Sequence, residues 1–225
     1  MKHLFTNRFG GVSHPPYDSF NLALHVGDNS LHVEQNRDIL KKKIGVSSIL
    51  FMNQVHGDIV ECVDKNTTTP SCDAMITNAK GLALCVMVAD CIPVLLFDKV
   101  RNVIGVAHAG RAGSFLHIGQ KTVQKMLDNY GSCVENISIF MGPSIRSCCY
   151  EVSKEIVCGF ESYLTCRGGK CFLDLQTLNR DDFLKIGILP KNIMIEPTCN
   201  CCDKRFFSYR RDGVTGRFCG IIALE

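Results

Sequence analysis

The sequence has no long apolar segment, no strong charge of either sign and no tryptophan. Its longest apolar run, residues 82–89, is far shorter than the roughly 18 residues that cross a bilayer, and it suits a buried strand instead. The net charge of +3 is too small to indicate a nucleic-acid partner, and the single basic run, residues 41–43, is typical of the solvated end of a helix. We therefore expect a protein that binds neither membranes nor nucleic acids.

The beginning of the sequence shows no secretory signal, because residues 1–6 lack an apolar segment. The 14 cysteines are fewer than the roughly 8–10% of residues found in disulfide scaffolds. We expect a cytoplasmic protein with reduced thiols, most of them small buried hydrophobic residues. Cys199 and Cys202 have C-x-x-C spacing, but a second metal would need two more ligands nearby, so we interpret both as packing thiols.

The length of 225 residues and the hydrophobic content of 46% are enough for one well-buried core, so we expect a single domain over residues 1–225. The mixed order of predicted helices and strands favours an α+β domain over a bundle or a barrel. Residues 92–97 and 103–107 predict a hairpin. Helices are expected near residues 31–43, 114–129, 153–162 and 179–186, and strands near residues 49–55, 59–63, 82–89, 92–97, 103–107, 137–141, 193–195, 206–209 and 218–223.

Three residues at the ends of apolar runs point to metal chemistry: His56, Cys91 and His108. Two imidazoles and one thiolate are ligands that zinc prefers, and three protein ligands leave the fourth tetrahedral position open. An open zinc is a Lewis acid and a source of hydroxide near neutral pH. Each residue taken alone is better explained by packing or by an ordinary hydrogen bond. No short motif links the three, so their spacing does not decide between these interpretations.

The motifs around these residues resemble those of the YfiH-like family. QVHG at residues 54–57, ADCIPVL at residues 89–95 and HAG at residues 108–110 are similar to the three successive motifs of that family. Further similar motifs are FTNR at residues 5–8, GPSI at residues 142–145, CCYEV at residues 148–152 and FFSYRRDG at residues 206–213. The resemblance therefore extends over essentially the whole chain.

The resemblance implies a single α+β domain with two mixed sheets between helical layers. It also implies one active-site zinc bound by His56, Cys91 and His108. The activities it implies are phosphorolysis of adenosine, inosine, guanosine or methylthioadenosine, and hydrolytic deamination of adenosine. The family has also been linked to peptidoglycan editing, and its older label is polyphenol oxidase or laccase.

The sequence departs from the family pattern beside the third metal ligand. The family usually has HAGWRG, whereas this chain has HAGRAG, with Arg111 and Ala112 in the changed positions. Arg146 also stands where a glycine is usual. The expected metal ligands are unaffected by these changes, but we expect the substrate preference to be altered.

Phosphorolysis requires an anion site, and the chain has no G-x-x-x-x-G-K-[ST] loop to supply one. Arginines are therefore the candidates for phosphate, namely Arg37, Arg211 and Arg217, and we predict substrate contacts for Asn21, Arg37 and Arg211. If residues 206–209 continue as a strand, Arg210 and Arg211 point to opposite faces, so at most one of them faces a pocket.

Two charged residues, Asp90 and Arg211, have two interpretations each. Asp90 either orients a ligand imidazole or caps a turn, since both roles suit a carboxylate beside Cys91. Asp73 is a candidate proton carrier. Arg211 either faces substrate or pairs with Asp212.

Two other activities fit the same residues. A phenol oxidase with one copper at the three ligands suits imidazole and thiolate chemistry, but a multicopper centre does not fit seven histidines with no His-X-His pair. A thiol hydrolase would use Cys91 as nucleophile with His56 or His108 as base, without metal. We expect a monomer or weak homo-oligomer that acts on a purine nucleoside and phosphate.

Overall fold

The apolar run at residues 82–89 forms the central strand β5 (Leu82–Val88) of the computed structural model, which describes residues 1–225. Leu84 and Val86 pack into the core on one face of this strand, and Ala83 packs into a second core on the other. A strand that is apolar on both faces has to be covered on both sides. The prediction of a doubly covered strand is confirmed.

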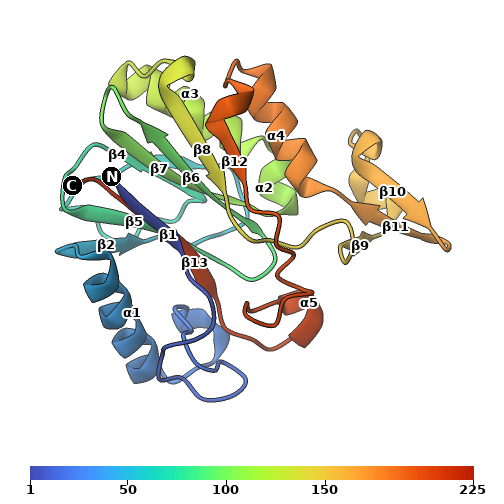
Figure 1. The fold of residues 1–225 in the computed structure, drawn as a ribbon, viewed down its shortest axis with the longest axis horizontal. Coiled ribbons are helices and arrows are strands. Elements are labelled where there is room, and N and C mark those ends of the chain that lie inside the picture. Colours follow the sequence, from blue (N-terminus) through green and yellow to red (C-terminus); the bar gives the residue numbers. More distant parts are fainter.

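Two mixed sheets stack on each other, and a small third sheet projects to one side (Figure 1). The strands are β1 (Lys2–Phe5), β2 (Ser48–Phe51), β3 (Val60–Cys62), β4 (Ala74–Thr77), β5, β6 (Ile92–Asp98), β7 (Val103–Ala109), β8 (Ile137–Met141), β9 (Glu151–Val152), β10 (Leu164–Arg167), β11 (Lys170–Leu173), β12 (Ile193–Ile195) and β13 (Phe218–Ala223). The four-stranded sheet has the order β1-β13-β5-β2, and the six-stranded sheet has the order β12-β8-β6-β7-β4-β3. The small sheet has the order β10-β11-β9.

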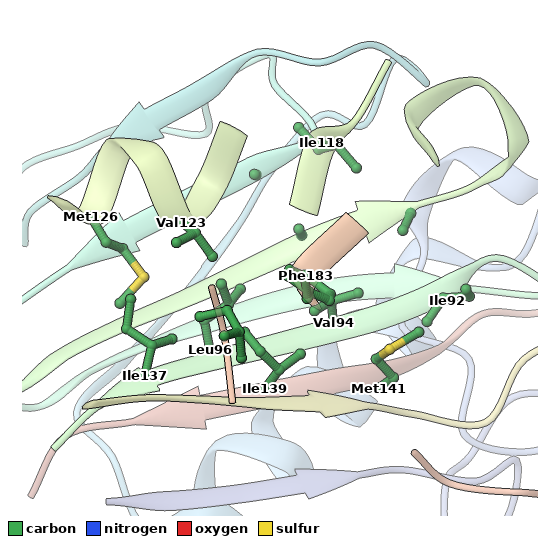
Figure 2. Packing of buried hydrophobic residues seen from close by; sticks show 14 of the residues in the cluster. Ile92, Val94, Leu96, Ile118, Val123, Met126, Ile137, Ile139, Met141 and Phe183 are labelled. Atoms are coloured by element: carbon green, nitrogen blue, oxygen red, sulfur yellow. The ribbon is translucent and has the colours of Figure 1, made fainter. Parts of the chain in front are cut away.

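Helices cover the outer face of each large sheet (Figure 1). The helices are α1 (Ser30–Ile44), α2 (Arg111–Phe115), α3 (Ile118–Tyr130), α4 (Leu175–Lys185) and α5 (Tyr209–Asp212). Leu40 of α1 packs on the four-stranded sheet, and Val123 of α3 and Phe183 of α4 pack on the six-stranded sheet (Figure 2). The predicted single α+β domain, with mixed sheets between helical layers, is confirmed.

Local signals explain where the correctly predicted helices begin and end. The side chain of Asn29 accepts a hydrogen bond from the backbone N–H of Leu31 and so caps α1. Gly45 ends this helix with a φ of 71°, which favours glycine. The side chain of Asp174 caps α4, so this helix begins earlier than the predicted residues 179–186.

Three other predicted elements differ from the structure. The helix expected at residues 114–129 is divided into α2 and α3, because His117 has a φ of 59° between them. Residues 153–162 form two short 3-10 turns separated by Gly159, whose φ is 87°. Residues 206–209 form no strand: Ser208 instead caps α5, so Arg210 and Arg211 lie on one helical turn.

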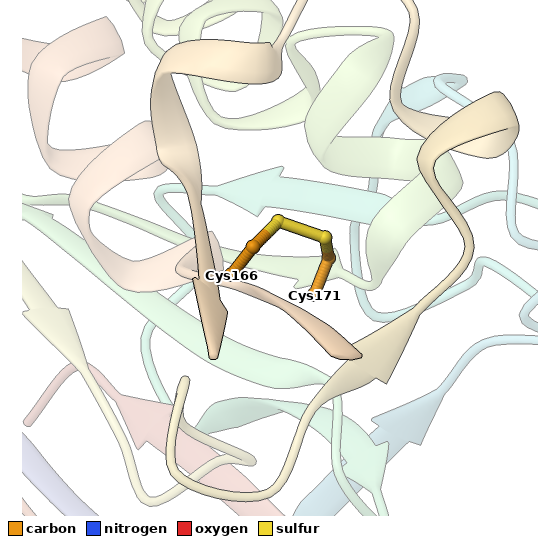
Figure 3. Close-up of a disulfide and its surroundings, with 2 residues drawn as sticks. All are labelled: Cys166 and Cys171. Atoms are coloured by element: carbon orange, nitrogen blue, oxygen red, sulfur yellow. A yellow bond between two sulfur atoms is a disulfide. The ribbon is translucent and has the colours of Figure 1, made fainter. Parts of the chain in front are cut away.

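The cysteines also differ from expectation. Cys166 and Cys171 face each other across β10 and β11 and form a disulfide (Figure 3), so the prediction of reduced thiols throughout is wrong. Among the other cysteines only three are buried, which contradicts the prediction that most are packing thiols; the buried ones are Cys72, Cys85 and Cys219. No helix combines the length and the apolar character needed to cross a membrane.

The contact between α3 and α4 yields a stability prediction. A Cβ atom on Gly119 would lie 2.6 Å from Cζ of the buried Phe183 ring. We expect Gly119→Ala to lower the free energy of unfolding by about 1–2 kcal/mol, because overpacking outweighs the better helix propensity of alanine. Urea denaturation measures this change. The control Gln124→Ala, on the exposed face of α3, should change the free energy by less than about 0.5 kcal/mol, and an equal effect of both would contradict the prediction.

Candidate metal and substrate site

The β6–β7 hairpin positions two of the three predicted metal ligands. Cys91 directly precedes β6, and His108 lies near the end of β7, where it is paired with Pro93 of β6. His56 reaches them from the loop after β2. The ligand atoms of all three residues lie within 4.8 Å of one another, and the rings of His56 and His108 are 4.7 Å apart between centroids. The structure thus brings together residues far apart in the sequence.

Asp73 holds both histidines in place. One oxygen of this fully buried carboxylate lies 2.8 Å from Nδ1 of His108. The same carboxylate accepts hydrogen bonds from the backbone N–H groups of His56, at 3.0 Å, and Gly57, at 2.7 Å. With Nδ1 of His108 donating to Asp73, its Nε2 is left for Cys91 or a metal. These contacts give Asp73 the orienting role that the sequence left open for Asp90.

Asp90 caps a turn, which is the second of its two predicted roles. Its carboxylate accepts hydrogen bonds from the side chains of Asn200, at 2.9 Å, and Ser208, at 2.6 Å, and from the backbone N–H of Arg210, at 2.6 Å. The backbone of Asp90 has a φ of 96°, in the left-handed region that is strained for a residue with a side chain. These three donors fix the turn that presents Cys91.

Close packing around Cys91 requires a glycine in the third motif. A Cβ atom on Gly110 would lie 2.8 Å from Sγ of Cys91 and 3.6 Å from the ring of His56. A larger residue would therefore displace the thiol. This contact gives a physical reason for the glycine that follows His108 by two positions.

Cys91 and His108 stabilise each other's charged forms. Burial opposes ionisation of Cys91, but the adjacent His108 and His56 outweigh it and lower the pKa of the thiol to about 6. Burial also opposes the charge on His108, but Cys91 and Asp73 raise its pKa to about 9. The metal-free site is therefore a thiolate beside an imidazolium at neutral pH.

A cavity of about 390 Å³ opens beside the three residues, within the range of small-molecule sites. Its wall combines aromatic rings, apolar side chains of the β5–β6 connection and two arginines. The lining residues are His25, Gln54, His56, Met87, Val88, Ala89, Asp90, Cys91, His108, Ile145, Tyr150, Tyr209, Arg210 and Arg217.

Arg217 places a charge in this cavity with spare hydrogen-bond donors. Its Nη1 donates to the carbonyls of Thr215, at 2.9 Å, and Gly216, at 3.1 Å, while Nε and Nη2 have no protein acceptor. Burial lowers the pKa of the neighbouring His25, and the positive charge of Arg217 lowers it further. The cavity thus offers a fixed cation beside an imidazole kept neutral.

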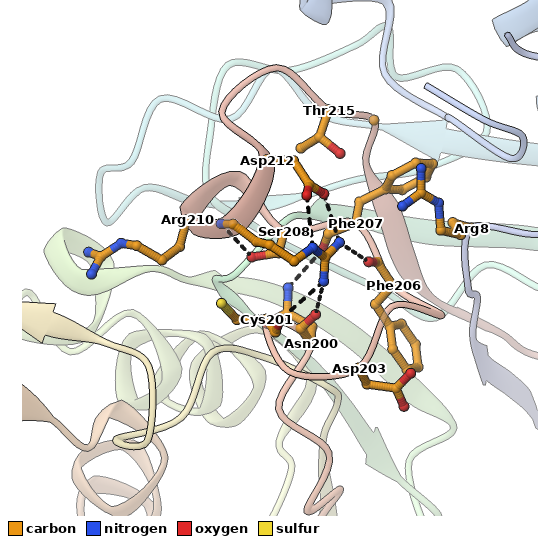
Figure 4. A network of polar contacts seen from close by, with 12 residues as sticks. Arg8, Asn200, Cys201, Asp203, Phe206, Phe207, Ser208, Arg210, Asp212 and Thr215 are labelled. Atoms are coloured by element: carbon orange, nitrogen blue, oxygen red, sulfur yellow. Dashed lines mark hydrogen bonds and ion pairs between the residues drawn. The ribbon is translucent and has the colours of Figure 1, made fainter. Parts of the chain in front are cut away.

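The three predicted substrate contacts do not line the cavity. Asn21 is buried, and its side-chain oxygen accepts a hydrogen bond from the backbone N–H of Arg217, so Asn21 positions that residue. Arg37 donates to the carbonyl of Leu22 and lies over the ring of Phe51. Arg211 forms a two-point ion pair with Asp212, its alternative interpretation, and its other donors reach the carbonyls of Asn200, Cys201 and Phe206; these acceptors are labelled in Figure 4.

Comparison with known proteins identifies the family. A family model described as "Multi-copper polyphenol oxidoreductase laccase" matches residues 2–225. A crystal structure of the hypothetical protein YfiH from Bacillus licheniformis superimposes with a TM-score of 0.94 at 32% identity, covering 99% of this chain and 92% of that one. The chain belongs to the YfiH family. The resemblance of its motifs is therefore confirmed.

Curated members of the YfiH family carry a different name from the family model. The purine nucleoside phosphorylase Rv2149c of Mycobacterium tuberculosis is 37% identical over 100% of this chain and 92% of its own length. The purine nucleoside phosphorylase YfiH of Escherichia coli is 34% identical over 97% of this chain and 92% of its own length.

The charge pair at Cys91 predicts how the metal-free protein reacts with alkylating agents. We expect the alkylation rate of Cys91 to rise through pH 6 and level off by pH 8, because the reactive thiolate forms above its pKa of about 6. Mass spectrometry of chelator-treated protein measures the rate at each residue. Cys62, whose pKa burial raises, is the internal control and should react slowly throughout this range. A midpoint for Cys91 near pH 9 would contradict the prediction.

Proposed function

We propose that this chain is a zinc-dependent purine nucleoside phosphorylase. The observation that carries the proposal is the grouping of His56, Cys91 and His108 on the wall of a cavity that also contains the unpaired donors of Arg217. The names of curated relatives at 34–37% identity support the same reaction.

The donor set fits zinc with one open position. No further His, Cys, Asp or Glu joins the group of His56, Cys91 and His108, so three protein ligands are offered. The lowered pKa of Cys91 favours the thiolate that a metal requires. When bound, zinc would supply Lewis-acid chemistry at the cavity wall.

The cavity offers the groups that phosphorolysis needs. In this reaction a phosphate oxygen bonds to the anomeric carbon of the sugar as the bond from that carbon to the purine nitrogen breaks. The base leaves with the electron pair and takes up a proton. Arg217 would bind the phosphate with its spare donors, and the rings of Tyr150 and Tyr209 would flank the planar base.

Hydrolytic deamination of adenosine is the second candidate, since an open zinc site suits it equally and it needs no phosphate. The thiolate of Cys91 beside His108 favours a thiol hydrolase only if the site works without metal. A multicopper oxidase is disfavoured because the other group of candidate metal ligands in this chain contains no histidine. One copper at the same three residues remains the oxidase alternative.

A single assay separates these reactions. We expect zinc-loaded protein to convert inosine and phosphate to hypoxanthine and ribose 1-phosphate, with no base released when phosphate is omitted. Chromatography identifies the products. Inosine formed from adenosine without phosphate would indicate deamination, and activity that survives chelation would contradict a zinc enzyme.

The same assay tests the phosphate site. Arg217→Gln should raise the KM for phosphate about 10–100-fold, because a charged hydrogen bond contributes roughly 1.5–3 kcal/mol. Arg180→Gln, on the exposed face of α4, is the control and should leave the KM unchanged. Equal kinetics of both variants would remove Arg217 from the phosphate site.

The support that Asp73 gives to His108 predicts an effect on metal affinity. Asp73→Asn should weaken zinc binding about 10–100-fold, because it removes the carboxylate that orients the ligand imidazole. Competition with a chromophoric chelator measures the affinity. Asp58→Asn, at an exposed carboxylate paired only with Lys121, should bind zinc as the unaltered protein does. Unchanged affinity for Asp73→Asn would show that His108 needs no such support.

A further inference from the structure

Four cysteine thiols gather at a second place, outside the cavity. The Sγ atoms of Cys148, Cys149, Cys199 and Cys202 all lie within 4.8 Å of one another. Cys148 and Cys202 are exposed, and Cys149 and Cys199 are half-buried. The two further ligands that the C-x-x-C pair lacked in the sequence are therefore present. The exposure of Cys202 also contradicts its interpretation as a packing thiol.

The spacing of these sulfur atoms is close to that of a tetrahedral metal site. Zinc binds thiolates at about 2.3 Å, which places the sulfurs of a tetrahedron about 3.8 Å apart. The Sγ atom of Cys148 lies 3.7 Å from those of both Cys149 and Cys202, and the Sγ atoms of Cys149 and Cys202 are 3.2 Å apart. A single disulfide would use only two of the four sulfurs and would not explain why the other two lie beside them.

The fold explains why these segments meet. Strands β8 and β12 are parallel neighbours, with Met141 beside Ile195, so the loops after them leave from the same edge of the sheet (Figure 1). An isolated bridge between Ser144 and Cys199 continues the pairing beyond the strands. The loop after β8 then delivers Cys148 and Cys149, and the loop after β12 delivers Cys199 and Cys202.

The surroundings suit a negatively charged cluster. Four thiolates around one divalent zinc carry a net charge of about −2 once the thiol protons have been released to solvent. Arg167 donates to the carbonyl of Cys148 at 3.0 Å, and Arg210 donates to the carbonyl of Cys149 at 3.4 Å.

We propose that Cys148, Cys149, Cys199 and Cys202 bind a second zinc ion in a closed, structural site. Four protein ligands leave no position for substrate, in contrast to the three at the cavity. The ion would join the loops after β8 and β12, two segments with little regular structure of their own.

This second site would brace the cavity wall. Asn200, between two of the cysteines, donates to Asp90 at 2.9 Å and to the carbonyl of Phe207 at 2.8 Å. Tyr150, directly after Cys149, lines the cavity. The zinc–thiolate cluster would therefore hold both the turn that presents Cys91 and one aromatic wall of the cavity.

Metal stoichiometry tests the proposal on the full chain. We expect two zinc ions per chain by elemental mass spectrometry after purification from zinc-supplemented cells. The double variant Cys199→Ser/Cys202→Ser should keep one ion, and His56→Ala/His108→Ala should also keep one. Cys62→Ser/Cys133→Ser, which removes two exposed thiols outside the cluster, should keep both ions. If the His56→Ala/His108→Ala variant keeps its ion, the second site stands even where the proposed phosphorylase activity fails.

A second measurement covers the case in which the cluster variant does not fold. Zinc-edge X-ray absorption of His56→Ala/His108→Ala should report four sulfur neighbours at about 2.3 Å, since only the cluster would remain occupied. Chelation of this variant should lower its melting temperature. One zinc per unaltered chain that disappears in His56→Ala/His108→Ala would overturn the proposal. A disulfide between any two of the four cysteines in the zinc-supplemented protein would also overturn it.

Discussion

A buried carboxylate is the constraint on which the candidate active site depends. Asp73 has no exposed surface, yet its charge is compensated by the imidazole of His108 and by backbone N–H groups of the loop that carries His56. Burial by itself would raise the pKa of this carboxyl group, but these donors lower it, so the group remains ionised. Through one side chain, Asp73 fixes residues that come from separate parts of the chain.

The cavity and the thiol cluster show two uses of similar ligands. Three ligands beside an open cavity are suited to chemistry, whereas four ligands near the surface are suited to joining loops. Both sites are positioned by segments at the ends of strands. The β5–β6 turn presents Cys91, and the loops after the parallel strands β8 and β12 carry the four cysteines. Asp90 connects the two regions through Asn200 and Ser208.

The arginines predicted to bind phosphate have different roles in the structure: two stabilise the fold and one lines the cavity. Arg211 is fully engaged by Asp212 and by backbone carbonyls, whereas Arg37 donates from Nε to the carbonyl of Leu22 and lies over the ring of Phe51, outside the cavity. Arg217 alone among the predicted arginines lines the cavity with donors to spare. The sequence does not separate these roles, because an arginine that pairs with a neighbouring carboxylate and an arginine that faces a cavity occur in similar motifs.

The layered arrangement of sheets and helices was expected only from the family resemblance. The sequence itself indicates the α+β class, the central strand β5 and the boundaries of strands such as β8, because apolar periodicity and capping residues act over short distances. Its motifs also indicated His56, Cys91 and His108. The three-dimensional structure was needed to show that their ligand atoms converge, that Asp73 rather than Asp90 orients an imidazole, and that Cys148 and Cys149 join Cys199 and Cys202. Convergence depends on how parallel strands and loops align across the sheet, and no local property of the chain encodes those distances.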